Sequence, residues 1–310
     1  MILYCHPMTR HQIHSFSILL AALVTGATAC AEPHSDDRFK VIGTLENSRL
    51  IEASGIQAGH AGVFYLHNDQ KRDVFVIDES GKDLGAFKLD GSKSKDWEDI
   101  TRIPTDGAPL LVIADTGDNH MKHDEVRLYF FPEPAEGEYG RDLDVTHRLT
   151  VKYPDGAHDV EAVAYDSSNR DILLMSKRDR PPRLYRLPLD KALSEEDLEA
   201  EFLAEVPTLR PPTSQDLLDS PKRGPWVSQP TGLDISPDGR TAAVLTYRSL
   251  YIFTRDQGES WAQAFQKKPE EFLGPPGKHD EAVSFSLDGK SVYVTTERRP
   301  APIYRLDLDP

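Results

Sequence analysis

The sequence predicts an all-β fold, and three observations support this prediction. Apolar and polar residues alternate over short runs, as in "VFYLHND" and "SVYVTTERR". Turn signals such as "DG", "NR" and "PDG" separate these runs. A unit of about 55 residues recurs from residue 50 onward. Alternation with tight turns is typical of antiparallel meanders of short strands, and a repeat of this length indicates that several such meanders are assembled side by side.

Each repeat opens with a short strand that starts at an acidic or hydroxyl residue. The five openings are "EASGIQA" from Glu52, "WEDITRI" from Trp97, "VEAVAYD" from Val160, "PTGLDIS" from Pro230 and "DEAVSFS" from Asp280. Aligned, their leading positions are Glu52, Glu98, Glu161, Thr231 and Glu281, at intervals of 46, 63, 70 and 50 residues. The loops therefore vary in length while the unit persists.

Further strands follow each opening strand. The second strands are "VFYLHND", "LLVIADTGDN", "ILLMSKRD", "AAVLTYR" and "SVYVTTERR", and the third are "DVFVID", "VRLYFF", "RLYRLPL", "SLYIFT" and "PIYRLDL". Most repeats add a fourth, outer strand, such as "LGAFKLD", "HRLTVKY" or "EAEFLAEV". The last repeat stops after three strands, and the N-terminal "FKVIGTLE" is a spare strand that would complete it. Five blades of four antiparallel strands, closed into a ring by the N-terminal strand, make a β-propeller.

Two details qualify this prediction. A sixth, degenerate blade within residues 190–226 is the alternative, although that stretch fits an outer strand and a long proline-rich loop better. The run "TRDQGESW" (Thr254–Trp261) resembles the sialidase Asp-box, a structural turn between the third and fourth strands of a blade.

The N-terminal segment is expected to be a signal peptide. Arg10 supplies a basic region, Phe16–Val24 an apolar run, and small residues precede Cys30 in "ATAC", which resembles a bacterial lipobox. The apolar run is short for a membrane span. We expect residues 1–29 to be a lipoprotein-type leader with Cys30 lipidated, 30–38 a tether and 39–310 the propeller domain. Simple secretion after Ala29 is the alternative, and translation starts at Met1 or Met8.

Composition restricts the partners. The formal net charge is −15, which disfavours nucleic acid and an anionic membrane surface. Both cysteines, Cys5 and Cys30, precede the predicted domain, so disulfides do not hold it together. We expect a monomer in the bacterial cell envelope, exported, facing the periplasm or the cell surface, and attached to the membrane only through the lipid anchor.

The leading residues of the five repeats are candidate metal ligands. In a propeller the innermost strands begin on one face of the ring, so Glu52, Glu98, Glu161, Thr231 and Glu281 are expected to converge on the central channel. Four carboxylates about 5 Å apart at an effective dielectric constant near 20 repel one another by on the order of 20 kcal/mol in total. Protons, basic partners or a metal must cancel this repulsion. A ring of hard oxygen ligands without cysteine suits Ca²⁺ better than zinc.

These residues also carry a family resemblance. The order of blade starts, with "EASGI" and "VEAVAY", looks like that of the SdiA-regulated family of bacterial calcium-binding propellers. The ring is also similar, more distantly, to that of the calcium-activated nucleotidases (apyrases), which are five-bladed with an axial calcium. "DWEDI", "ADTGDN" and "YPDGAHDVEA" further resemble a group of secreted bacterial propellers without an assigned activity. The resemblance implies a propeller with axial Ca²⁺ over about residues 40–310. Thr231 departs from the serine of both named families.

Loops between second and third strands are expected to surround the metal. They supply candidate catalytic or anion-binding groups: His67, His120, Asp118, Lys177, Arg178 and Arg248. Basic side chains beside a calcium suit a small anionic ligand or an acidic envelope component, although the same side chains could instead pair with neighbouring acids. The proline-rich segment 208–229 is either a lid over this face or an ordinary insertion.

Two functions fit these features. The first is a calcium-binding propeller of the cell envelope with an axial Ca²⁺ site, an anion-binding face and a binding or scaffold role. The alternative is a Ca²⁺-dependent hydrolase of phosphate esters or nucleotides, resembling a phosphatase, nucleotidase or phytase. The domain has no G-x-S-x-G elbow, Walker loop or H-E-x-x-H motif.

Overall fold

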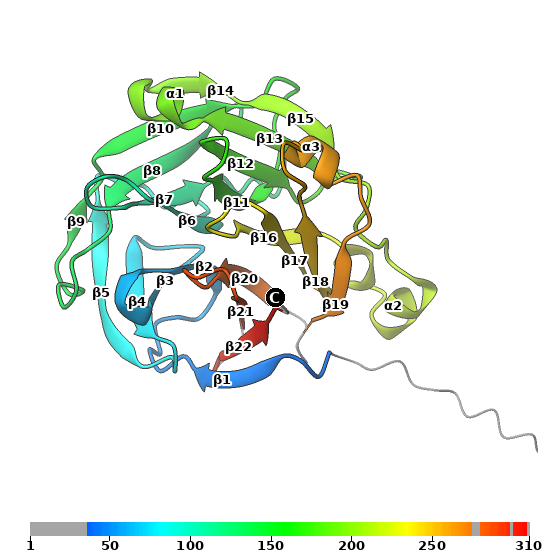
Figure 1. The fold of residues 1–310 in the computed structure, drawn as a ribbon, viewed down its shortest axis with the longest axis horizontal. Coiled ribbons are helices and arrows are strands. Elements are labelled where there is room, and N and C mark those ends of the chain that lie inside the picture. The colour runs from blue at the N-terminus through cyan, green and yellow to red at the C-terminus, as the bar shows by residue number, and fades with distance from the viewer. Residues whose placement is uncertain (1–35, 275–279, 298–299, 309–310) are drawn as a thin grey trace, which may run out of the picture. The chain divides into compact units, whose positions relative to one another are not determined.

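The computed structural model describes residues 36–274, 280–297 and 300–308 (Figure 1). Strands dominate this part of the chain, and they form five sheets around a common centre. The all-β, five-bladed propeller is therefore confirmed. The expected leader (1–29), its two start positions, Cys30 and most of the 30–38 tether lie outside the described residues.

The blades follow one another along the chain. Blade 1 contains β2 (Ala53–Ala58), β3 (Val63–Asn68), β4 (Asp73–Asp78), β5 (Asp83–Asp90) and a short strand β9 (Leu143–Asp144). Blade 2 contains β6 (Asp99–Ile103), β7 (Leu110–Asp115), β8 (Val126–Pro132), β10 (His147–Lys152) and a short strand β14 (Asp197–Glu199). Blade 3 contains β11 (Val160–Asp166), β12 (Asp171–Ser176), β13 (Arg183–Pro188) and β15 (Glu201–Glu205). Blade 4 contains β16 (Pro230–Ile235), β17 (Thr241–Thr246), β18 (Ser249–Thr254) and β19 (Glu270–Leu273).

Blade 5 joins the two ends of the domain. It contains β20 (Asp280–Phe285), β21 (Ser291–Thr296), β22 (Pro302–Asp307) and the N-terminal strand β1 (Lys40–Thr44). Strand β1 pairs antiparallel with β22, with Lys40 opposite Arg305. The prediction that the N-terminal strand completes the last blade is confirmed. The innermost strands β2, β6, β11, β16 and β20 each contact the innermost strands of the two neighbouring blades.

The predicted sixth-blade alternative is not realised. Residues 189–226 form α1 (Leu189–Ser194), β14, the outer strand β15, α2 (Ser214–Asp219) and the 3₁₀ turn η2 (Gly224–Trp226). The other helical elements are η1 (His60–Gly62) and α3 (Trp261–Ala264). None of the helices in the described part of the chain is both long and apolar enough to span a bilayer.

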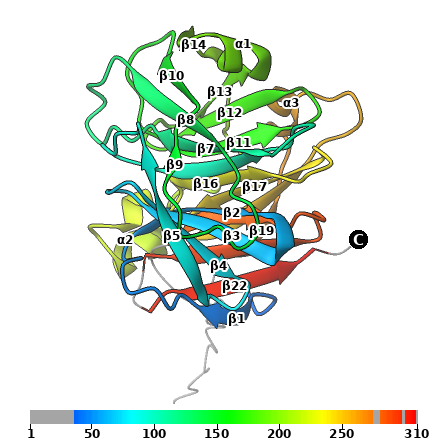
Figure 2. The ribbon, with the colours of Figure 1, turned by 90° about the vertical axis from the view of Figure 1, so that its left-hand side faces the viewer.

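The core lies between the blades. Facing sheets bury apolar residues against each other in five clusters, such as Val112, Leu128, Val163 and Leu174 between blades 2 and 3. Every residue of β2, β11 and β16 is buried, because these strands have a neighbouring blade on each side. Figure 2 shows the ring turned by 90°, with the outer strand β5 toward the viewer.

Two buried carboxylates link the innermost strands inside the channel. Asp99 on β6 accepts hydrogen bonds from the backbone N–H groups of Val163 on β11 (2.8 Å) and Leu233 on β16 (3.4 Å). Asp234 on β16 accepts one from Phe285 N–H on β20 (2.7 Å). Burial raises the pKa of Asp234 to about 7 and that of Asp99 well above its usual range. These bonds connect blades that share no backbone ladder.

The Asp-box resemblance falls where it is expected, between β18 and β19. Within this turn Arg255 is buried and forms a two-pronged ion pair with the fully buried Asp166 of blade 3, at 2.9 and 3.0 Å. Its guanidinium also lies 4.5 Å from the centre of the Trp261 ring. The turn therefore ties blade 4 to blade 3.

Replacing Arg255 should test this link. Arg255→Met leaves the Asp166 carboxylate buried without its partner, and we expect a loss of about 3 kcal/mol in the free energy of unfolding, measured with urea. The exposed Arg240→Met is the matched control and should change stability by less than about 0.5 kcal/mol. Equal stability of the two variants would contradict a structural role for the turn.

Candidate metal centre

A β-bulge at the start of the innermost strands marks one equivalent residue in each blade. The pairing register shifts between Ala53 and Gly55, Val160 and Ala162, Pro230 and Gly232, and Asp280 and Ala282. In blade 2, the Glu98 N–H donates to the carbonyl of Ala114, although Ala114 is already paired with Asp99. Glu98 and Asp99 therefore both face one residue of the partner strand, as in a bulge. The five equivalent positions are Ser54, Glu98, Glu161, Thr231 and Glu281. A bulge leaves its extra residue outside the ladder and re-aims its side chain.

The alignment of the first blade was wrong by two residues. The side chain of Glu52 is exposed and precedes β2, and Ser54 holds the bulge position instead. The sequence did contain a signal for this register, since Ser54-Gly55 matches Thr231-Gly232. Gly55 is required there because a Cβ would lie 2.5 Å from Nε2 of His67. The expected ring therefore has three glutamates and two hydroxyl residues at the bulge positions.

Three buried carboxylates meet at one point of this ring. One oxygen from each of Glu98, Asp159 and Glu161 lies within 4.8 Å of the others, a spacing that can hold one metal ion. We call these residues the acidic triad. Asp159 was missed by the sequence analysis, although it lies two residues before Glu161 in "DVEA". The alignment compared only the leading position of each blade. In the corrected register Asp159 lies two positions before the bulge residue, as Glu52 does in blade 1 and Asp96 in blade 2, so the repeat did contain a signal for it.

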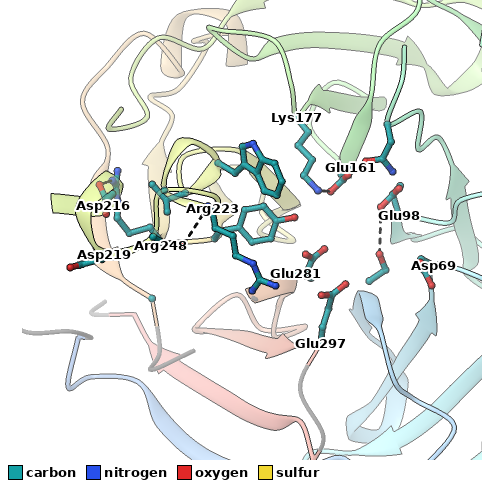
Figure 3. Close-up of a pocket in the computed structure, with 18 of the residues that line it drawn as sticks. Asp69, Glu98, Glu161, Lys177, Asp216, Asp219, Arg223, Arg248, Glu281 and Glu297 are labelled. Atoms are coloured by element: carbon teal, nitrogen blue, oxygen red, sulfur yellow. Dashed lines mark hydrogen bonds and ion pairs between the residues drawn. The ribbon is translucent and has the colours of Figure 1, made fainter. Parts of the chain in front are cut away.

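The Lys177 side chain enters the same cluster from the end of β12. Its ammonium contacts the Glu161 carboxylate and lies 5.0 Å from the centre of the Tyr247 ring. Figure 3 shows Lys177 and Glu161 pointing toward each other, with Glu98 and Glu281 around the same central space. Basic partners were one of the three ways to cancel the expected repulsion, and Lys177 supplies one from a loop rather than from a strand start.

One ammonium does not cancel the charge of the cluster. Burial raises the pKa of Glu161 to about 7 and that of Glu281 to about 8, with Lys177 opposing both shifts. Burial, and then the Glu161 charge, hold the pKa of Glu98 well above its usual range. Burial alone would lower the pKa of Lys177, but Glu161 and Glu281 outweigh it and keep the ammonium charged. The cluster therefore retains protons at neutral pH or takes up a further cation.

A cavity of about 440 Å³ opens above the acidic triad (Figure 3). Its charged lining residues are Asp69, Asp96, Glu98, Glu161, Lys177, Asp216, Asp219, Arg223, Arg248, Glu281 and Glu297. Eight carboxylates thus face three basic groups. This excess favours a cation as the first occupant, and an anion is attracted only after that charge is offset.

The proline-rich segment 208–229 forms one wall of the cavity. Asp216 and Asp219 of α2 and Trp226 of η2 line it, and the Trp226 residue is 41% exposed. Arg248 holds this wall in place, since it bonds Asp216 at 2.7 Å and the Arg210 carbonyl at 2.5 Å. Arg248 was expected to bind an anion, and its guanidinium is instead bonded to the segment 208–229.

Arg178 and Asp118 both contact Asp159 of the acidic triad. Arg178 Nε lies 2.6 Å from Asp159 Oδ2, although the two are not aligned for a hydrogen bond, and the guanidinium also contacts Asn119. The Asp118 N–H donates to Asp159 Oδ1 at 2.7 Å, while its carboxylate accepts from the N–H groups of Lys122 and His123. Both residues fix the position of Asp159.

The two candidate histidines do not line the cavity. His67 is fully buried, packs edge-on against Trp97 at 5.6 Å and contacts the Asn68 carbonyl at 3.1 Å. His120 is exposed in the loop between β7 and β8. Of the six loop candidates, Lys177 and Arg248 line the cavity, Arg178 and Asp118 contact a triad residue, and the histidines do neither. Arg298 and Arg299 of the last blade lie outside the described residues.

Comparison with known proteins assigns no family and no activity. The sequence matches no family model, and no curated protein matches it. The structure is similar to a PQQ-bound aldose sugar dehydrogenase from Streptomyces coelicolor, with 12% identity, 87% of this chain and 98% of that chain covered, and a TM-score of 0.49. It is also similar to a proposed gluconolactonase (13% identity, 84% and 76% covered, TM-score 0.46) and a luciferin-regenerating enzyme (12%, 87% and 95%, 0.45). At these identities and scores, neither shared residues nor a shared activity follows.

The buried imidazole of His67 should make stability depend on pH. Burial lowers the pKa of His67 to about 4, from about 6.5 in the unfolded chain. The unfolded state therefore binds more protons between these values, so the contribution is fully present above about pH 6.5 and falls as the pH drops toward 4. The loss is on the order of 3 kcal/mol. Urea unfolding at several pH values should show a smaller loss in His67→Gln, and an identical pH profile in both proteins would contradict this.

Lys177 should stabilise the metal-free protein. In EDTA at pH 8, Lys177→Met should lower the free energy of unfolding by about 3 kcal/mol, because it leaves buried carboxylates without their cation. The exposed Lys152→Met is the control, with an expected change below about 0.5 kcal/mol. If the two variants unfold at the same urea concentration, the ammonium does not neutralise the cluster.

Proposed function

We propose that the protein is an exported metal-binding propeller of the bacterial cell envelope, in which an axial Ca²⁺ joins the blades and prepares the cavity for an anionic ligand. The observation that carries this proposal is the acidic triad, whose oxygens lie within 4.8 Å of one another beside a cavity of about 440 Å³. The role is binding or scaffolding, since a propeller alone implies no catalysis.

The donor chemistry favours Ca²⁺ over softer metals. The acidic triad offers carboxylate oxygens, and Ser54, Thr231 and Glu281 add further oxygen donors at the bulge positions. Cysteine and histidine are absent from the described residues that line the cavity. Ca²⁺ takes six to eight oxygen ligands in flexible geometry. The resemblance of the blade starts to the SdiA-regulated propellers supports the same ion.

The surroundings of the acidic triad also fit a bound cation. Gly117 lies so close that a Cβ there would collide with the carboxylates of Glu98 and Asp96. The backbone therefore encloses the acids on the β7–β8 side and leaves the cavity side open. A divalent ion held by these acids would supply the positive charge that Lys177 alone does not.

The location rests on the N-terminal sequence. The basic region, short apolar run and "ATAC" before Cys30 support export and a lipid anchor. A charge of −15 supports a partner other than nucleic acid.

Thermal melting with and without metal tests the site. We expect millimolar Ca²⁺ to raise the melting temperature of the 31–310 protein by roughly 5 °C over EDTA, as binding at about 100 times Kd contributes about 2.7 kcal/mol. Glu98→Gln and Glu161→Gln should lose this shift. Glu52→Gln should keep it, because that side chain is exposed.

The results for Glu52→Gln and for the wild type each test one part of the proposed site. Loss of the shift in Glu52→Gln would restore Glu52 as a ligand and overturn the assignment of Ser54. If Ca²⁺ does not change the melting temperature of the wild type, the calcium proposal is overturned. The acids then form a proton-sharing cluster around Lys177.

A Ca²⁺-dependent hydrolase of phosphate esters or nucleotides is the second candidate. The cavity favours it, because Lys177 and Arg223 line the same space as Glu98 and Glu161 of the triad. A metal there would polarise a phosphoryl oxygen while the basic groups hold the anion. Turnover of such esters by the Ca²⁺-loaded wild type, lost in Glu161→Gln, would replace the scaffold role with this one.

A further inference from the structure

A second, positively charged groove lies beside the acidic cavity. It has a volume of about 540 Å³ and is lined by Lys71 and Arg72 from the β3–β4 loop, Lys88 from β5, and Lys93 from the β5–β6 loop. We call these four residues the basic groove. All four are exposed. Their gathering stands out in a chain with 51 acidic and 36 basic residues.

The cations of the basic groove are largely unpaired. Lys71, Lys88 and Lys93 form no ion pair within the described part of the chain. Arg72 reaches Asp90 only at 3.7 Å, in an exposed pair that contributes little. Asp73 is the one acid among the lining residues, and Arg49 already binds it at 3.2 Å. The groove therefore retains a positive charge that neighbouring acids balance only in part.

The backbone under these side chains is fixed. Lys93 N–H donates to the Tyr129 hydroxyl at 3.1 Å, and the Lys93 carbonyl accepts from the buried Trp97 indole at 2.8 Å. Lys88 lies opposite Asp73 in the β4–β5 ladder. Lys71 is held at a φ of +82°, a conformation uncommon for a side chain of this kind. A charged groove on a rigid base loses less entropy on binding than one on a mobile loop.

The same two loops build the basic groove and the acidic cavity. Asp69 lines the cavity and Lys71 the groove, while Asp96 lines the cavity and Lys93 the groove. The loops are joined where Trp97 N–H donates to the Asp69 carbonyl at 2.8 Å. Sites of opposite charge thus lie on adjacent segments of blade 1.

From these observations we infer that the basic groove binds small, multiply charged oxyanions of the phosphate class. Lysine ammonium groups bind such anions as point charges, and four cations around one groove match a ligand with two or more negative charges. This site is distinct from the proposed axial metal centre and does not require it.

Calorimetric titration with inorganic pyrophosphate tests the inference. The full 31–310 protein is used at about 50 mM salt with EDTA present, so that metal-bound pyrophosphate does not contribute and the test is independent of the calcium proposal. We expect saturable binding that weakens as salt rises, because exposed charges are screened. Lys88→Gln with Lys93→Gln should weaken it roughly tenfold, since half of the cations are removed.

The matched control is Lys152→Gln with Lys191→Gln, which removes the same charge from exposed positions outside the groove. It should bind pyrophosphate as the wild type does. Absence of binding, or equal weakening in both double variants, overturns the inference. Binding to phosphatidylglycerol vesicles but not to pyrophosphate also overturns it, and would assign these lysines to a membrane surface.

Discussion

The convergence of carboxylates on the propeller axis is the constraint on which the rest of the site depends. Five innermost strands begin on one face, and the bulge positions of four of them, Ser54, Glu98, Glu161 and Glu281, line one cavity. In bulk water such charges would repel weakly, but burial in a low-dielectric channel makes them costly. Lys177 offsets part of this cost, and the raised pKa values of Glu161 and Glu281 show that it does not offset all of it.

The ring tolerates this arrangement because other interactions hold the blades together. Strand β1 joins the two ends of the domain through β22. Asp99 and Asp234 accept backbone hydrogen bonds from neighbouring blades, and Arg255 of blade 4 pairs with Asp166 of blade 3. These links are independent of the acidic triad. The centre is therefore free to hold unsatisfied charge, which is what a metal site requires before its ion binds.

Acidic and basic side chains lie in separate places on blade 1. The acidic cavity and the basic groove share two loops, yet each has its own charge balance. The insertion carrying α2 and η2 encloses the cavity from the other side through Arg248 and Asp216. A ligand near the axis thus meets a cavity with an excess of carboxylates. A ligand at the basic groove meets lysines that form no ion pair in the described part of the chain.

The repeat length and the turn residues of the sequence were enough to determine the five blades and the closing strand β1, and they aligned Glu98, Glu161, Thr231 and Glu281 at equivalent strand starts, because these features repeat along the chain. Glu52 was chosen because an acidic residue two positions from Ser54 satisfied the same pattern, although Ser54-Gly55 already matched Thr231-Gly232. The pairing of Ala53 with Asn68 sets the register. Lys177 was found as a loop candidate for anion binding, not as a partner of Glu161. Asp159 was missed although Glu52 and Asp96 hold the same repeat position. The tertiary structure decided their roles, since a contact between Lys177 and Glu161 depends on where two loops meet in space rather than on their spacing in the chain.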